Sequence, residues 1–199
     1  MTTKSNSIKG LLSKLPRYSY SINQKQMEPI SLILLGSRSD ILRRFQKAGW
    51  YLSARITPAT ILKSTWATIA DSSYRSGPMW PSFINGHQNS FGFEMPTAAN
   101  TYRRRHHLRI WKIISKKSDT QLWVGTISYD RGVGVIRHSL IPAHHISPNL
   151  ELEEEYLART LDVLKPLYLR LAPPEKGVIN TGDAYVWDGR ALVLDMREK

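Results

Sequence analysis

Two neighbouring segments with alternating polar and apolar side chains constrain the fold of this chain more than any other feature. Residues 106–114 read His-His-Leu-Arg-Ile-Trp-Lys-Ile-Ile, and residues 121–129 read Gln-Leu-Trp-Val-Gly-Thr-Ile-Ser-Tyr. Alternation with a period of two is typical of strands that place one face against a core. The polar segment 115–120 between them is short enough for a turn, so we expect an antiparallel pair.

The alternation separates the side chains of each strand into two sets, because successive residues point to opposite faces. On the first strand, one face carries His107, Arg109 and Trp111, and the other carries His106, Leu108 and Ile110. On the second strand, a single face carries Leu122, Val124, Thr126, Ser128 and Asp130. Neighbouring histidines in a regular strand therefore cannot share a site. We expect at most one of His106–His107, and one of a second pair, His144–His145, to point into a common site unless a bulge intervenes.

Composition and charge narrow the class of partner. The chain has 199 residues, 41% of them hydrophobic, with 28 Lys and Arg against 16 Asp and Glu and a formal net charge of +12. This suits one folded domain whose partners are anionic: phosphate groups, nucleic acid or an acidic membrane surface. The chain has no cysteine, which excludes disulfides, thiolate nucleophiles and zinc ribbons.

The N-terminal part differs from the rest in composition. Residues 1–28 are rich in Ser, Lys and Gln, and we interpret them as a basic arm on a single domain that spans residues 29–199. The longest apolar runs, such as 30–35, are far below the roughly 20 residues of a membrane span, and no signal peptide follows Met1. We therefore expect a cytoplasmic protein, with peripheral membrane attachment left open because the arm carries a short basic amphipathic pattern.

Three helices are expected on the sheet. The first runs over 40–48 with Ser37 or Ser39 as its cap, and the second runs to about residue 70 from Thr57–Pro58, an N-cap followed by proline. The third runs over 149–164, with a glutamate-rich first turn that we interpret as solvated surface and dipole partners. The stripe expected to face inward on the second helix is Ile61, Leu62, Thr65, Trp66 and Ile69. The stripe expected on the third is Leu152, Tyr156, Leu157, Thr160, Leu161 and Leu164.

Turn signals complete the expected fold. Asn85-Gly86 predicts one hairpin and Asp188-Gly189 predicts another, between strands at 185–187 and 191–194. A further strand is expected over 135–141. The fold class that results is α+β: a single domain with a mainly antiparallel or mixed β-sheet and about three packed helices.

Four spaced motifs resemble a known family. They are Arg104-Arg105-His106-His107-Leu108-Arg109-Ile110-Trp111, then Leu122 through Asp130-Arg131-Gly132-Val133-Gly134, then His144-His145-Ile146, and Glu153-Glu154-Glu155-Tyr156-Leu157. In this order they are similar to the LssY C-terminal domain family, over roughly residues 30–165. The resemblance implies a domain of unknown biochemical function. In larger members of the family the domain is appended to membrane modules similar to phosphatidic-acid phosphatases or DedA proteins, which implies lipid or membrane phosphate chemistry.

The first functional hypothesis is a binding module for a phosphate-bearing or other anionic ligand. Guanidinium groups bind phosphate in a bidentate way, and histidines supply further hydrogen bonds. The expected partner is an anionic small molecule or a phospholipid head group. The residues assigned to this ligand are Arg105, Arg109, Arg131, His106 and His144.

The second hypothesis is a metal-dependent hydrolase acting on a phosphoryl or acyl ester. His107, Asp130 and His145 would form a set of two histidines and one carboxylate that suits a divalent metal ion. The metal would activate a water molecule, and the same three residues are the catalytic candidates. A Ser-His-Asp triad has no Gly-x-Ser-x-Gly signature to support it.

Two further alternatives remain open. In a purely structural cluster, Asp130 pairs with Arg105 or Arg109 inside the sheet and the histidines satisfy backbone carbonyls. Nucleic-acid binding is the least favoured alternative: the basic and aromatic segment 102–111 suits stacking on a single strand, but a nucleic-acid fold signature is missing.

Overall fold

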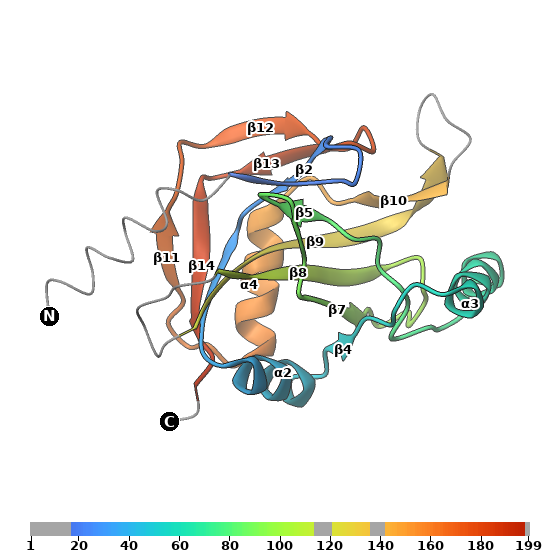
Figure 1. The fold of residues 1–199 in the computed structure, drawn as a ribbon, viewed down its shortest axis with the longest axis horizontal. Coiled ribbons are helices and arrows are strands. Elements are labelled where there is room, and N and C mark those ends of the chain that lie inside the picture. The colour runs from blue at the N-terminus through green and yellow to red at the C-terminus, as the bar shows by residue number, and fades with distance from the viewer. Residues whose placement is uncertain (1–16, 114–120, 136–141, 198–199) are drawn as a thin grey trace, which may run out of the picture.

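A mixed eight-stranded sheet forms the centre of the molecule in the computed structural model, which describes residues 17–113, 121–135 and 142–197 (Figure 1). The strand order is β11-β14-β3-β9-β8-β7-β4, and β10 pairs with the outer part of β9. The β3–β14 pair is parallel, and the other strand pairs of this sheet in the described residues are antiparallel. Its strands are β3 (Leu32–Leu35), β4 (Tyr51–Leu52), β7 (Phe91–Pro96), β8 (Arg105–Ile113), β9 (Leu122–Val135), β10 (Pro142–Ile146), β11 (Leu167–Arg170) and β14 (Arg190–Asp195).

Two small sheets accompany the central one. One has the order β2-β1-β5-β6 and the other is the pair β12-β13. Their strands are β1 (Tyr18–Tyr20), β2 (Gln26–Pro29), β5 (Phe83–Ile84), β6 (His87–Gln88), β12 (Glu175–Val178) and β13 (Ala184–Trp187). With three helices in the described ranges, the predicted α+β class with antiparallel and mixed sheets is confirmed.

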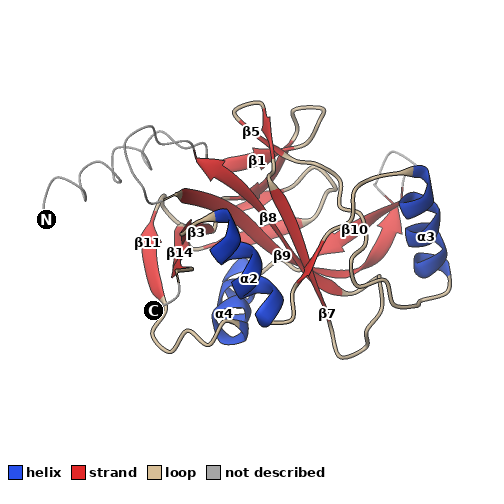
Figure 2. Cartoon of the chain, turned by 60° about the horizontal axis from the view of Figure 1, so that its bottom comes forward, coloured by secondary structure: helices blue, strands red, loops and turns tan. Residues whose placement is uncertain are grey.

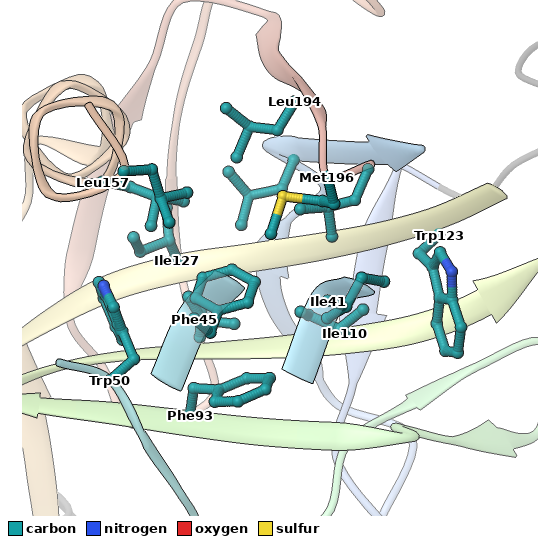
Figure 3. Packing of buried hydrophobic residues seen from close by; sticks show 14 of the residues in the cluster. Ile41, Phe45, Trp50, Phe93, Ile110, Trp123, Ile127, Leu157, Leu194 and Met196 are labelled. Atoms are coloured by element: carbon teal, nitrogen blue, oxygen red, sulfur yellow. The ribbon is translucent and has the colours of Figure 1, made fainter. Parts of the chain in front are cut away.

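Two of those helices cover one face of the central sheet. They are α2 (Arg38–Lys47) and α4 (Leu150–Thr160), which lie next to each other in Figure 2. Ser37 caps α2 through a reciprocal pair with Asp40, so the structure selects Ser37 from the two predicted caps, Ser37 and Ser39. The core between helices and strands is aromatic and aliphatic (Figure 3). Phe45 of α2 stacks on Phe93 of β7 with ring centroids 4.6 Å apart.

The third helix, α3 (Pro58–Ile69), packs against the body with the side opposite to the one expected. Its Thr57 N-cap and first-turn proline are confirmed. The stripe expected to face inward is exposed, and the buried side chain is Ala67 on the other side of the helix. Figures 1 and 2 show α3 away from α2 and α4, at the end of the molecule where β10 lies. The expectation of an inward apolar stripe was therefore wrong.

The face of α4 also differs from the expected one. Leu152 and Leu164 are exposed, whereas Glu153 and Glu154 are buried. Burial raises the pKa of Glu154 to about 9, and the nearby carboxylates of Asp188 and Glu151 add to the shift. The interpretation of these glutamates as solvated was wrong, because the helix is rotated by about one residue relative to the stripe read from the sequence.

One expected hairpin forms and the other does not. Asn85 and Gly86, both with positive φ, join β5 to β6 as predicted. Asp188 and Gly189 instead lie between strands of different sheets: β13 pairs with β12, whereas β14 pairs with β11 and β3. The strand expected over 135–141 lies mostly outside the described residues.

The described part of the N-terminal segment belongs to the folded body. Residues 18–20 and 26–29 form β1 and β2, and Ser19 and Glu28 are buried. Residues 17–28, which we assigned to a basic arm, are thus part of the domain, while 1–16 lie outside the described residues. Within the described ranges, no helix is long and apolar enough to span a bilayer.

Candidate functional site

The face of the central sheet opposite α2 and α4 holds a buried cluster of charged residues. In register across β7, β8 and β9, Glu94 pairs with His107 and His107 with Ser128, while Arg105 pairs with Asp130. The alternation predicted for β8 is confirmed: Leu108 and Ile110 enter the main core, and Arg105, His107 and Arg109 lie on the opposite face. The cluster is therefore a direct product of the period of two in the sequence.

Asp130 is the centre of this cluster. Its Oδ1 lies 3.1 Å from His107 Nδ1, and its Oδ2 lies 3.1 Å from His144 Nδ1 and 3.3 Å from Arg105 Nε. The side chain is almost fully buried. Burial acts to raise the pKa of Asp130, but the charges of His107 and His144 outweigh it and hold the pKa well below its usual range. Asp130 is an anion that its neighbours already neutralise.

Glu94 and Arg105 form a second contact at the edge of the cluster. Arg105 Nη1 lies 2.8 Å from Glu94 Oε2, and its guanidinium carbon lies 4.0 Å from the centre of the Tyr102 ring. Burial raises the pKa of Glu94 to about 7, although Arg105 and His107 oppose the shift. A small pocket that Tyr74 and Arg75 also line reaches these two side chains. It is the size of a water molecule or two rather than of a metabolite.

Glu28 closes the cluster from β2. Its Oε1 accepts hydrogen bonds from Arg109 Nη1 and Ser128 Oγ, each 3.3 Å long. Burial alone would raise the pKa of Glu28, but the Arg109 charge and His107 lower it to about 2. The sequence did not single out Glu28, although a glutamate between Met27 and Pro29 before an apolar strand was a visible signal. Glu94, in the apolar strand Phe91–Pro96, was missed in the same way.

His107 is held as a cation between these carboxylates. Burial acts to lower its pKa, but the charge and hydrogen bonding of Asp130, with Glu28, raise it to about 9. His107 Nε2 lies 2.9 Å from Ser128 Oγ. Because that hydroxyl donates to Glu28, it accepts from the protonated ring.

Asp130, His107 and Ser128 thus lie in the spatial order of a catalytic triad, but His107 Nε2 already carries a proton. A triad histidine must accept the serine proton, and a charged ring cannot. Ser128 is also only 1% exposed. Ser128 therefore has neither a histidine that can accept its proton nor access to a substrate, and the arrangement fits a structural network.

A second group lies on the other side of β10. His145 Nδ1 lies 2.9 Å from Asp183 Oδ1, and Arg131 Nη2 donates to the same oxygen at 3.4 Å. Asp183 Oδ2 accepts from Thr181 Oγ1 at 2.7 Å and from the backbone N–H of Ile146 at 3.4 Å. Asp183 was not predicted from the sequence, because it lies in a Thr-Gly-Asp turn with no distinguishing pattern.

These residues border a hollow that is open to solvent. Its walls include Arg131, Gly132, His145, Thr181, Gly182 and Asp183. A Cβ added at Gly134 would lie 2.4 Å from His145 Nε2, whereas one added at Gly132 would meet nothing within 4 Å. Gly134 is therefore the residue that makes room for the His145 ring.

His106 joins neither group. Its Nδ1 lies 2.6 Å from Glu153 Oε2, and its ring stacks on Tyr156 of α4 at 3.7 Å between centroids. The sequence-predicted residues are thus divided among three places. His107, Asp130, Arg105, Arg109 and His144 lie together, Arg131 and His145 lie by the hollow, and His106 lies under α4.

A β-bulge decides which histidine of the second pair reaches Asp130. His145 pairs with Gly132 but Ile146 pairs with Asp130, so Arg131 is an extra residue in β9. An extra residue inverts the alternation beyond it. His144 consequently lies on the face of Asp130, and His145 does not. Within the described ranges, no three His, Asp or Glu side chains are arranged to hold a metal ion.

Comparison with known proteins adds one finding. The sequence profile described as LssY C-terminus matches residues 12–191. The chain belongs to the LssY C-terminus family. The match extends beyond the four motifs at both ends, and it includes the segments that supply Glu28 and Asp183. No curated protein and no solved structure matched the chain.

Proposed function

We propose that this LssY C-terminus domain binds a phosphate-bearing or other small anionic ligand in the hollow beside Arg131 and His145. One observation carries the proposal. The exposed guanidinium of Arg131 lies at the wall of an open hollow, next to the buried carboxylate of Asp183. Arg131 is 58% exposed in its side chain. Arg131 contacts Asp183 through Nη2 alone, at 3.4 Å, and Asp183 also accepts from His145, Thr181 and the backbone N–H of Ile146.

The geometry of His145 supports the same assignment. Asp183 holds Nδ1, which fixes the ring plane and leaves Nε2 for another partner. A guanidinium group at the wall of a solvent-open hollow suits a phosphate oxygen more than a neutral ligand.

The buried cluster supports a different role for the other arginines. Arg105 and Arg109 are nearly inaccessible, and each already contacts a carboxylate. Three cations, Arg105, His107 and Arg109, face three carboxylates, Glu28, Glu94 and Asp130. We assign this cluster a structural role, as an ionic layer between β2 and the central sheet.

A hydrolase remains the second candidate, and one observation favours it. A carboxylate-oriented histidine next to an anion-binding arginine is the arrangement of a general acid or base. In that case His145 would transfer the proton and Arg131 would hold the phosphoryl or acyl ester. A divalent metal ion held by His107, Asp130 and His145 has less support, because His145 contacts Asp183 and not Asp130.

Isothermal titration with inorganic phosphate and with glycerol 3-phosphate, at constant ionic strength, tests the proposal. We expect saturable binding by the wild-type chain and about ten- to hundredfold weaker binding by Arg131→Gln, since a charge-assisted hydrogen bond contributes about 1.5–3 kcal/mol. The control is Arg104→Gln, which removes the same charge from an exposed residue just before β8. This variant should bind phosphate like the wild type. Equal weakening in both variants would mean that only net charge matters.

Turnover separates the two candidates. A binding module should leave a chromogenic phosphate ester and a chromogenic acyl ester intact. Hydrolysis by the wild type that His145→Gln abolishes, with phosphate affinity reduced only slightly, would support the hydrolase instead.

A further inference from the structure

Helix α3 exposes the side of itself that helices normally bury. Ile61, Leu62, Trp66 and Ile69 are 41%, 72%, 67% and 66% exposed. With 3.6 residues per turn these positions fall on one side, within an arc of about 140°. The opposite side, which faces the body, carries only short side chains: Thr60, Ser64, Ala67 and Thr68 are half-buried or buried.

This orientation is costly unless another surface covers it. Large apolar side chains scattered singly on a surface are ordinary, but several on one face mark an interaction site. The helix would have buried more apolar surface had it packed with its Trp66 side inward. Instead, the stripe points outward, and Arg103 Nε donates to the Thr68 carbonyl at 2.6 Å, which ties the C-terminal end of the helix to the segment before β8.

The charges around this face indicate what covers it. The twelve residues of α3 contain no acidic side chain, and Lys63 is exposed on its flank. Exposed Arg55 precedes the N-cap, and Arg103, which also pairs with Asp71 at 3.6 Å, lies at the other end. A tryptophan among aliphatic residues, bordered by cations, is the composition of helices that lie in the interface of an anionic bilayer.

We propose that α3 is an interfacial helix that inserts its Ile61-Leu62-Trp66-Ile69 face into membranes containing anionic phospholipid. The helix lies at one end of the molecule (Figures 1 and 2), so the face can meet a flat surface without moving the central sheet. Lys63 and Arg55 would contact the lipid phosphates at the rim. This surface does not depend on the anion site at Arg131.

Co-sedimentation of the full chain with vesicles tests the proposal. We expect binding to phosphatidylcholine vesicles that contain phosphatidylserine, weaker binding to phosphatidylcholine alone, and a decrease at high salt. Leu62→Ser with Trp66→Ser should reduce binding to the mixed vesicles by about a hundredfold or more, because two large apolar side chains no longer enter the bilayer. Lys63→Glu should reduce binding to the mixed vesicles and leave binding to phosphatidylcholine almost unchanged.

Leu164→Ser is the matched control, because Leu164 is 95% exposed and lies outside α3. It should sediment like the wild type, and so should Arg131→Gln, which separates this result from that of the anion site. No sedimentation of the wild type, or equal loss in Leu164→Ser and Leu62→Ser/Trp66→Ser, would overturn the proposal. So would a dimer in light scattering that Trp66→Ser dissociates, since the face would then bind a second copy.

Discussion

His144 and His145 are neighbours in β10, yet each holds its Nδ1 against a different buried carboxylate. His144 contacts Asp130, 3.1 Å away, and His145 contacts Asp183, 2.9 Å away. One residue of β9, the bulged Arg131, separates the two environments. The buried cluster and the solvent-open hollow therefore lie on opposite sides of β10. Substitution of His144 should change mainly stability, and substitution of His145 should change mainly ligand binding.

Asp130→Asn should destabilise the fold more than Asp183→Asn. The amide keeps the shape but leaves the charges of Arg105 and His107 without their shared partner, and breaking a buried ion pair in this way costs about 3–5 kcal/mol. Urea unfolding measures the loss. Asp183→Asn should cost less, because Arg131 is exposed to solvent. A loss below that of Asp183→Asn would contradict the central position of Asp130.

Glu28 and Arg109 should be energetically coupled across 81 residues of sequence. In a double-mutant cycle, Glu28→Gln and Arg109→Met should each destabilise the fold. The double variant should lose less than their sum, with a coupling energy of about 0.5–3 kcal/mol. Additive losses would show that β2 is not held to the sheet by this pair.

Stability should fall as the pH rises from about 6.5 to 9. The unfolded chain releases the His107 proton near pH 6.5, whereas the folded protein holds it to about pH 9. The contribution of His107 is therefore complete below about pH 6.5 and lost as the pH rises through 9. Glu94, whose pKa is raised to about 7, adds a decline of the same sign at lower pH.

Comparison of variants isolates the His107 contribution to this pH dependence. The free energy of unfolding of His107→Gln should change less between about pH 6 and pH 9 than that of the wild type. Glu154, whose pKa is also raised to about 9, is common to both proteins and cancels in the difference. His87→Gln, at the exposed β5–β6 hairpin, should retain the wild-type slope. Parallel curves for His107→Gln and the wild type would refute the assignment.

Gly134→Ala should weaken ligand binding in the hollow while Gly132→Ala should not. The new methyl group at Gly134 would lie 2.4 Å from His145 Nε2, which forces the ring away from Asp183. We expect phosphate affinity to fall by about tenfold, the value of one lost hydrogen bond of about 1–2 kcal/mol. Gly132→Ala adds a methyl group to open space, so titration should give the wild-type affinity.

Removal of divalent metal should leave the fold intact. Arg105, His107 and His144 already contact the carboxylate of Asp130, so no cation is required to neutralise it. Thermal unfolding with and without EDTA should give the same Tm. A lower Tm in EDTA, with metal content by elemental analysis that His107→Ala removes, would favour the metal-dependent hydrolase.

Local pattern was sufficient for the features that depend on nearest neighbours. The period of two in residues 105–113 determined that His107 and Arg109 share a face and that His106 lies on the other, and β8 has this arrangement. Capping at Thr57 was equally readable, and the cap of α2 was narrowed to Ser37 or Ser39, because a cap bonds only residues about three positions away. The order of the four motifs identified the family.

Tertiary structure decided the features that depend on distant partners. The bulge at Arg131 selected His144 over His145 for Asp130, and Glu28, Glu94 and Asp183 entered their sites from strands and turns far along the chain. Helix α3 is the clearest case: its sequence specifies a helix and an apolar stripe, but not which side faces the body. Periodicity defines the two sides of an element, whereas the packing of the whole domain chooses between them.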